Sequence, residues 1–129
     1  MRIASSAISL MVHDVAASSR FLVSHFGFRE AMAADGFVSL VHDDVATGVV
    51  FLQHGADWLP SGRKDPIASG LILSFVVTDL AAEEARLRRE GVAITIPIWE
   101  QPWGERLFRV TDPNGVAIEV VQGAAQTLD

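Results

Sequence analysis

Apolar and polar residues alternate over residues 6–12, and this alternation gives way to a helical pattern. A period of two is typical of a strand with one buried face. Asp14 precedes an alanine-rich run that continues to about His25, and its carboxylate suits a helix N-cap because it accepts a backbone N–H left free in the first turn. Gly27 stands where a helix commonly ends. The pattern predicts a strand followed by one helix.

The same pattern returns about half a chain later. The stretch SFVVTDLAAEEARL (74–87) repeats SLMVHDVAASSRFL (9–22), with Asp79 opposite Asp14. Self-similarity at a fixed offset indicates repeated structural units. The second copy predicts a strand over 71–77, then a helix from Asp79 that Gly91 terminates, so the chain consists of two similar modules.

Three short strands are predicted after each helix, bounded by turn residues. They cover 28–33, 37–42 and 49–54 in the first module, and 92–98, 105–111 and 116–122 in the second. Asp-Pro-Asn-Gly at 112–115 is the clearest turn in the chain. We therefore predict one domain over 1–129, made of a first βαβββ module (1–54), a connecting loop (55–70), a second βαβββ module (71–123) and a tail (124–129).

Composition and charge narrow the classes of function. Half of the 129 residues are hydrophobic, the formal net charge is −6, and no apolar run reaches the length of a membrane span. An acidic chain lacks the basic face that nucleic acid requires, so we expect neither a nucleic-acid nor a membrane partner. The short apolar N-terminal stretch is interpreted as a strand rather than a secretory signal. With no cysteine, a cytoplasmic protein is expected.

Three stretches carry a resemblance to a known family: MVHDVAASSRFLVSHFGF (11–28), FVVTDLAAEEARLRREGV (75–92) and PWGERLFRVTDPNGVAIEV (102–120). They resemble the vicinal oxygen chelate superfamily of glyoxalases, bleomycin-resistance proteins and extradiol dioxygenases. The third stretch is most similar to the bleomycin-resistance-like branch, although Val116 stands where that family usually has Asn.

The resemblance implies an α+β fold in which the two βαβββ modules form a cupped mixed β-sheet with the helices outside. Ligands of such proteins sit in the cup, which a second subunit often completes. We expect a homodimer, because an open cup leaves strand edges and apolar surface to be covered. Fold alone does not determine the chemistry of such a family, so the site is argued separately.

Metal-dependent members of the family carry one metal ligand on the first strand and one on the last strand of each module. Counted from the two Asp landmarks, these positions fall at Ala7, Phe51 or Leu52, Ile72 and Glu119. Only Glu119 can donate to a metal, whereas three protein ligands are usual for zinc. We therefore expect no metal and no cofactor. The alternative is a displaced metal site in which His42 converges with Gln53 or His54.

Glu119 needs a partner if its strand is buried, because an isolated ionised carboxylate is costly in an apolar setting. A tight hairpin at residues 112–115 places Arg106, Phe108 and Glu119 on one face, and a register shift of one residue substitutes Arg109 for Arg106. Two interpretations stay open: a structural ion pair or hydrated wall, and a polar anchor for a ligand.

All three tryptophans, Trp58, Trp99 and Trp103, are predicted in loops or at strand ends. Trp103 matches the tryptophan of the family's Pro-Trp-Gly motif, which lines the ligand cleft in antibiotic-binding members. Aromatic rings stack on planar or cationic ligands. The ligand-binding residues expected from these arguments are Trp103, Glu119, Arg106, Phe108, Phe51, His42, Trp58 and Trp99.

These residues favour metal-independent binding and sequestration of a small aromatic or cationic compound, as in antibiotic resistance. No catalytic residue is assigned. The alternative is a metal-dependent glyoxalase-like lyase or extradiol dioxygenase that uses the displaced site. A third hypothesis is a regulatory module whose cleft serves another protein.

Overall fold

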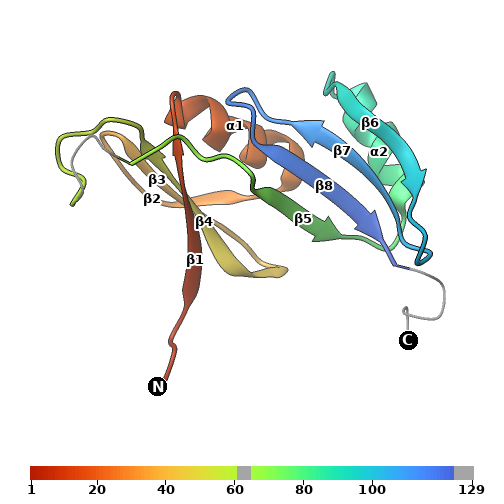
Figure 1. The fold of residues 1–129 in the computed structure, drawn as a ribbon, viewed down its shortest axis with the longest axis horizontal. Coiled ribbons are helices and arrows are strands. Elements are labelled where there is room, and N and C mark those ends of the chain that lie inside the picture. Colours follow the sequence, from red (N-terminus) through yellow and green to blue (C-terminus); the bar gives the residue numbers. More distant parts are fainter. Residues whose placement is uncertain (61–64, 124–129) are drawn as a thin grey trace. The chain divides into compact units, whose positions relative to one another are not determined.

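The computed structural model describes residues 1–60 and 65–123. Residues 61–64 of the expected loop and the whole expected tail, 124–129, lie outside the described residues. The chain divides into two compact units, Met1–Ser69 and Gly70–Asp129, which are described separately (Figure 1). The boundary between them falls at the end of the loop predicted to connect the two modules.

The described residues of the first unit form one helix and one four-stranded sheet. Its elements are β1 (Ser6–Val12), α1 (Val15–Phe26), β2 (Arg29–Ala34), β3 (Phe37–His42) and β4 (Val45–Gln53). The strand order is β1-β4-β3-β2, in which β1 pairs with β4 in parallel and the other pairs are antiparallel. The predicted βαβββ succession is confirmed, but β4 begins at Val45, four residues before the predicted 49–54.

The second unit repeats this architecture. Its elements are β5 (Ile72–Val76), α2 (Leu80–Arg89), β6 (Ile94–Glu100), β7 (Arg106–Thr111) and β8 (Ala117–Gln122). The order β5-β8-β7-β6, with β5 parallel to β8, matches the first sheet strand for strand. The expected α+β fold of two βαβββ modules, each a mixed sheet with its own helix, is therefore confirmed.

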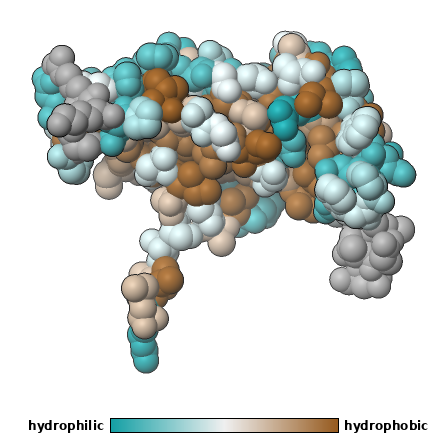
Figure 2. Space-filling model, viewed as in Figure 1, coloured by the Kyte–Doolittle hydropathy of each residue, from teal (hydrophilic) through white to brown (hydrophobic). Residues whose placement is uncertain are grey.

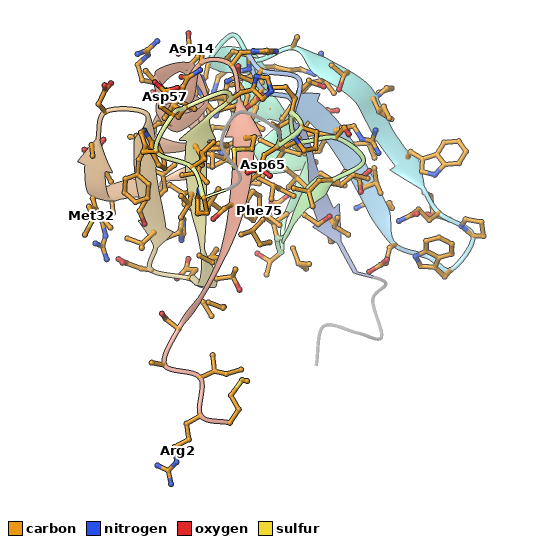
Figure 3. All side chains as sticks on the ribbon, turned by 60° about the vertical axis from the view of Figure 1, so that its left-hand side comes forward. Arg2, Asp14, Met32, Asp57, Asp65 and Phe75 are labelled. Carbon is orange, nitrogen blue, oxygen red and sulfur yellow. The ribbon has the colours of Figure 1, made fainter. Side chains whose placement is uncertain are left out.

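Both helices begin as the sequence predicts. The Asp14 carboxylate accepts from the Ala17 N–H at 3.0 Å, and Asp79 accepts from the Ala82 N–H at 3.1 Å. Figure 3 shows Asp14 at the start of α1. Gly27 ends α1 in the left-handed conformation with φ of 75°. Within residues 1–60 and 65–123, no helix is long and apolar enough to cross a bilayer.

One face of each sheet is covered by the unit's own helix. In the first unit α1 contacts β2, β3 and β4, and the strand residues on the covered face are almost fully buried: Leu10, Val38, Leu40, Val49 and Phe51. In the second unit α2 contacts β7 and β8, and the corresponding residues are Leu73, Phe108, Val110, Ile118 and Val120. Alternate residues of every strand therefore point to the opposite face, which we call the distal face of each sheet.

The hairpin between β7 and β8 has a different register from the tight turn predicted. The Asp112 N–H donates to the Val116 carbonyl at 2.9 Å, which leaves a three-residue loop closed by Gly115 with φ of 86°. A left-handed residue after a turn adds one residue to the loop as a bulge. The Asp112 side chain stabilises this loop by accepting from the Asn114 and Val116 N–H groups. The register consequently shifts by one, and Arg109 lies opposite Glu119.

Candidate functional site

A row of four side chains crosses the distal face of the second sheet from edge to edge. The pairing register places Ser74 of β5 beside Glu119 of β8, Glu119 beside Arg109 of β7, and Arg109 beside Ile96 of β6. Residues directly opposite one another across strands point to the same face. The row therefore consists of a hydroxyl, a carboxylate, a guanidinium and an aliphatic side chain.

Arg109 and Glu119 form an ion pair at the centre of this row. Arg109 Nη2 and Nε donate to the same carboxylate oxygen, Glu119 Oε2, at 2.6 and 3.2 Å. The Arg109 side chain is 30% exposed and the Glu119 side chain 15% exposed. Charge-assisted bonds of this length are among the stronger polar interactions in proteins. The ionised carboxylate of Glu119 is therefore neutralised by the Arg109 guanidinium.

The pair leaves one acceptor and one donor available. No hydrogen bond within the described residues engages Glu119 Oε1 or Arg109 Nη1. Every buried side-chain nitrogen or oxygen in the described part of the chain has a hydrogen-bond partner, so these two atoms are accessible to solvent. The centre of the distal face can therefore accept one further hydrogen bond at Oε1 and donate at Nη1.

Large apolar side chains flank the ion pair and are exposed. Trp99 is 59% and Val76 74% exposed, and Ile72 and Ile96 are also exposed. Trp99 and Val76 share a row with the buried Leu107 and Val121. α2 lies behind β6 and β7 in Figure 1, and hydrophobic atoms reach the surface over β5 and β8 in the same view in Figure 2. Isolated exposed apolar residues are ordinary, but a group of them around one charged pair is a feature of binding sites.

Sequence reasoning placed Ile72 on this face, as a position that holds a metal ligand in relatives, but it did not assign Ser74, Val76 and Ile96 to it. The signal that identifies them is the alternation of β5, in which Leu73 is buried while Ile72, Ser74 and Val76 are exposed.

The prediction that Arg106 and Phe108 share a face with Glu119 is wrong. Arg106 lies opposite Gln122, whose Oε1 accepts from the Leu80 N–H at the start of α2 at 2.9 Å. Phe108 lies opposite Val120 and is fully buried. Both therefore point to the face that α2 covers. The bulge at Gly115 is the physical cause, and it leaves Arg109 as the arginine beside Glu119.

The first unit has an uncharged residue where the second has Glu119. Ser9 pairs with Val50 across β1 and β4 as Ser74 pairs with Glu119 across β5 and β8, and Ser39 pairs with Val50 as Arg109 pairs with Glu119. The equivalent of Glu119 is therefore Val50 rather than the expected Phe51 or Leu52.

Phe51, expected to line a ligand site, belongs to the core. It is fully buried on the face that α1 covers and pairs with Leu10 and Val38. A residue between these two strands beneath a helix does not reach a ligand on the distal face.

The strand positions that hold a metal in related enzymes do not fit one here. In register they are Ala7, Val50, Ile72 and Glu119, and Glu119 alone has a donor atom, already engaged by Arg109. Within residues 1–60 and 65–123, no three His, Asp or Glu side chains gather so that they could hold an ion. One carboxylate provides fewer ligands than a catalytic divalent ion requires.

His42, Gln53 and His54, the components of the alternative metal site, do not converge. His42 lies opposite Val45 at the start of β4, whereas Gln53 ends the same strand, about 25 Å away along an extended chain. The His42 ring packs edge-on against Phe28, and its Nδ1 accepts from the Asp44 N–H at 3.0 Å. The Gln53 amide donates to the His13 carbonyl at 2.8 Å.

His54 contacts a second histidine rather than His42. Its ring packs edge-on against that of His13, with 5.3 Å between the ring centroids. His42, which contacts Phe28 and Asp44, is therefore separated from both of its expected partners. The displaced metal site predicted as the alternative does not form.

The three tryptophans occupy different environments. Trp58 is in the first unit, where its ring lies against Gly36. Trp99 is on the distal face of the second sheet, and Trp103 is in the loop between β6 and β7, 64% exposed. The Trp103 indole N–H donates to the Glu105 carboxylate at 2.7 Å, which orients the ring. A ligand-binding role for these residues stays a prediction.

Comparison with known proteins agrees with this fold. The family model of the glyoxalase/bleomycin resistance protein/dioxygenase superfamily matches residues 5–120. No protein with a curated description matches the sequence significantly.

Solved structures share the fold at low sequence identity. A glyoxalase/bleomycin resistance protein/dioxygenase from Nocardioides has a TM-score of 0.76 and 17% identity, over 97% of this chain and 86% of that chain. A superfamily member from Sphaerobacter thermophilus has a TM-score of 0.73 and 24% identity, over 95% and 98%. A lactoylglutathione lyase from Agrobacterium tumefaciens has a TM-score of 0.74 and 16% identity, over 95% of each chain. The chain belongs to the glyoxalase/bleomycin resistance protein/dioxygenase superfamily.

Proposed function

We propose that this protein binds and sequesters a small aromatic or cationic compound on the distal face of the second sheet, without a metal ion. The observation that carries the proposal is the Arg109–Glu119 ion pair surrounded by exposed Ile72, Val76 and Trp99. Small-molecule sites combine apolar walls with a few placed polar groups that orient the ligand.

The energetic case rests on the apolar side chains around the pair. Exposed aliphatic and aromatic groups release roughly 25 cal/mol per Å² of apolar surface when a ligand covers them. The Trp99 ring adds a stacking surface for a planar ligand, worth roughly 0.5–1.5 kcal/mol beyond the area buried. The ion pair contributes orientation rather than most of the affinity.

Sequestration is favoured over catalysis because the site lacks the groups that catalysis in this family needs. A Lewis-acid mechanism requires several metal ligands, and the register places Ala7, Val50 and Ile72 where those ligands are expected. The only carboxylate in the row, Glu119, is bonded to Arg109. Holding a compound out of solution requires shape and affinity alone.

Tryptophan fluorescence tests the proposal directly. A panel of planar aromatic compounds and aromatic cations is titrated into the unmodified protein, into Trp99→Phe and into Trp58→Phe. We expect saturable quenching in the unmodified protein and in Trp58→Phe, and loss of most of the signal in Trp99→Phe. Equal quenching in Trp99→Phe would place the ligand elsewhere, and no saturable change with any compound would contradict sequestration.

We also propose that the chain forms a homodimer. The edge strand β2 is exposed along its whole length, and Met32, which points outward from it in Figure 3, is 64% exposed. An uncovered edge strand with an apolar side chain favours association. Sedimentation analysis of the unmodified protein and of Met32→Lys tests this, and a monomer at every concentration would contradict it.

A further inference from the structure

We infer that the ligand is electrically neutral and that its aromatic body carries both a hydrogen-bond acceptor and a hydrogen-bond donor, as in a carboxamide or a lactam. This inference rests on the proposed function and narrows the class of compound that the same site takes. It excludes the cationic half of that class.

The distal face of the second sheet has no net charge at its centre, which disfavours a charged ligand. Among the registered strand residues on the distal face of the second sheet, the charged ones are Arg109 and Glu119, and they neutralise each other at 2.6 Å. A cation at the centre of this face meets the Arg109 guanidinium, and an anion meets the Glu119 carboxylate. Either one loses hydration without a free counter-ion, which is unfavourable in a partly desolvated site.

The ion pair has one acceptor atom and one donor atom that make no hydrogen bond within the described residues, and a ligand that covers the pair must satisfy both. Both bonds within the pair use Glu119 Oε2, so Oε1 can accept one hydrogen bond and Arg109 Nη1 can donate one. A ligand that only accepts leaves Oε1 unsatisfied when it covers the pair, and a ligand that only donates leaves Nη1 unsatisfied. Burying an unpaired polar group is costly, so a ligand with both functions is selected. The exposed Ser74 hydroxyl, in the same row, can satisfy either kind of group.

The apolar side chains define the rest of the molecule. Ile96 lies next to Arg109 in the row, and Trp99 lies in the neighbouring row on the same strand. Both are exposed, so a planar ring attached to the polar group can cover them. The inferred ligand is therefore a flat apolar ring system with one uncharged group of amide type.

Three compounds of one shape and different charge test this inference: 2-naphthamide, 2-naphthoate and 2-naphthamidine. The indole N–H signals of the three tryptophans report binding in proton–nitrogen correlation spectra, with assignments from the single Trp→Phe variants. We expect all binding to shift the Trp99 signal, and the neutral amide to bind at least about tenfold more tightly than either charged compound.

Charge variants reverse this preference. Glu119→Gln leaves Arg109 unneutralised, so naphthoate should gain about tenfold relative to the amide. Arg109→Gln leaves Glu119 unneutralised, so naphthamidine should gain instead. The matched control is Asp43→Asn, which removes the exposed Arg29–Asp43 pair of the first unit and should change no preference. The selectivity of the unmodified protein needs no variant, so the test does not depend on how the variants fold.

The outcomes separate the two proposals. If naphthoate or naphthamidine shifts the Trp99 signal at least as tightly as the amide, the neutral-ligand inference is wrong while binding at this face is supported. If none of the three compounds shifts the Trp99 signal, the proposed function fails together with the inference. A Trp99 signal that changes with protein concentration alone would show a second copy of the chain on this face and would also overturn the inference.

Discussion

The two units of this protein share one scaffold but differ at the centre of their distal faces. Each has a parallel pair formed by its first and last strands, two antiparallel strands beyond it, and a helix capped by an aspartate. At equivalent positions the first sheet has Ser9, Val50 and Ser39, and the second has Ser74, Glu119 and Arg109.

This difference shows which parts of the repeat serve the fold and which are free to serve a ligand. The caps and the helix-covered core recur in both units because each sheet must bury one face to be stable. The distal faces carry no such requirement, and there the second unit has a charged pair where the first has uncharged residues. The predictions that follow test whether that pair distinguishes the two units in stability and binding.

Exchanging the pair of the second unit for the residues of the first should have the largest effect on stability. Arg109→Ser removes the cation that partners Glu119, whose side chain is 15% exposed in the unmodified protein, and we expect a loss of about 1–3 kcal/mol in the free energy of unfolding. Glu119→Val should cost less, because the unpaired Arg109 can extend into solvent.

The double variant Arg109→Ser/Glu119→Val should be more stable than the sum of the single losses predicts, with a coupling of about 1–2 kcal/mol in denaturant titrations. Strictly additive losses would show that the two side chains do not act as a pair.

Introducing the charged pair at the equivalent positions of the first sheet tests whether that sheet tolerates it. Val50→Glu places a carboxylate on a half-buried strand position, and we expect a loss of about 1–2 kcal/mol in unfolding free energy. Adding Ser39→Arg should restore part of it, because residue 39 lies opposite residue 50 as Arg109 lies opposite Glu119. No recovery in the double variant would mean that the distal faces differ in more than these two positions.

The tryptophans of the two units should separate stability from binding. Trp99→Ala removes a largely exposed ring, so we expect weaker aromatic binding by about 0.5–1.5 kcal/mol with little change in unfolding. Trp58→Ala removes a ring that is 52% exposed and lies against Gly36, so thermal stability should fall slightly while binding is kept. Calorimetry on both variants, with ligand and without, measures the two effects. Weaker binding in Trp58→Ala and unchanged binding in Trp99→Ala would place the ligand site in the first unit.

The smallest effect is expected at the exposed Arg29–Asp43 pair of the first unit. A hydrogen bond from Arg29, together with its charge, lowers the pKa of Asp43 below its ordinary value. At pH values above the ordinary pKa of an aspartate, the pair therefore stabilises the fold. This contribution is lost as the pH falls through the lowered pKa of Asp43. Asp43→Asn should scarcely change stability at neutral pH, since exposed pairs contribute little. A large loss in thermal melts would contradict this.

Much of the scaffold could be predicted because its signals are local. Asp14 and Asp79 both cap their helices, and Gly27 ends α1 in the left-handed conformation that favours glycine. The existence of the strands follows from alternation in the sequence, and each of the eight strands among the described residues was expected near its observed position.

The candidate site was harder to predict because it depends on register. One left-handed residue, Gly115, moves β7 by one position against β8 and exchanges Arg106 for Arg109 beside Glu119. In the first unit, pairing with β1 assigns the equivalent position to Val50, which counting along the sequence placed one or two residues too late. Since adjacent strand residues point to opposite faces, each such error transfers a side chain between core and site.

Measuring ligand affinity with and without divalent cations is the most direct test of whether Glu119, paired with Arg109, contacts an organic ligand and does not bind a metal. Dissociation constants for one planar aromatic ligand are compared in chelator, and in nickel, zinc or manganese, for the unmodified protein and for Glu119→Gln. For the unmodified protein we predict the same dissociation constant in chelator and in each metal. For Glu119→Gln we predict a different dissociation constant, which again does not depend on the metal. Binding that requires a divalent cation and disappears in Glu119→Gln would contradict a metal-independent site.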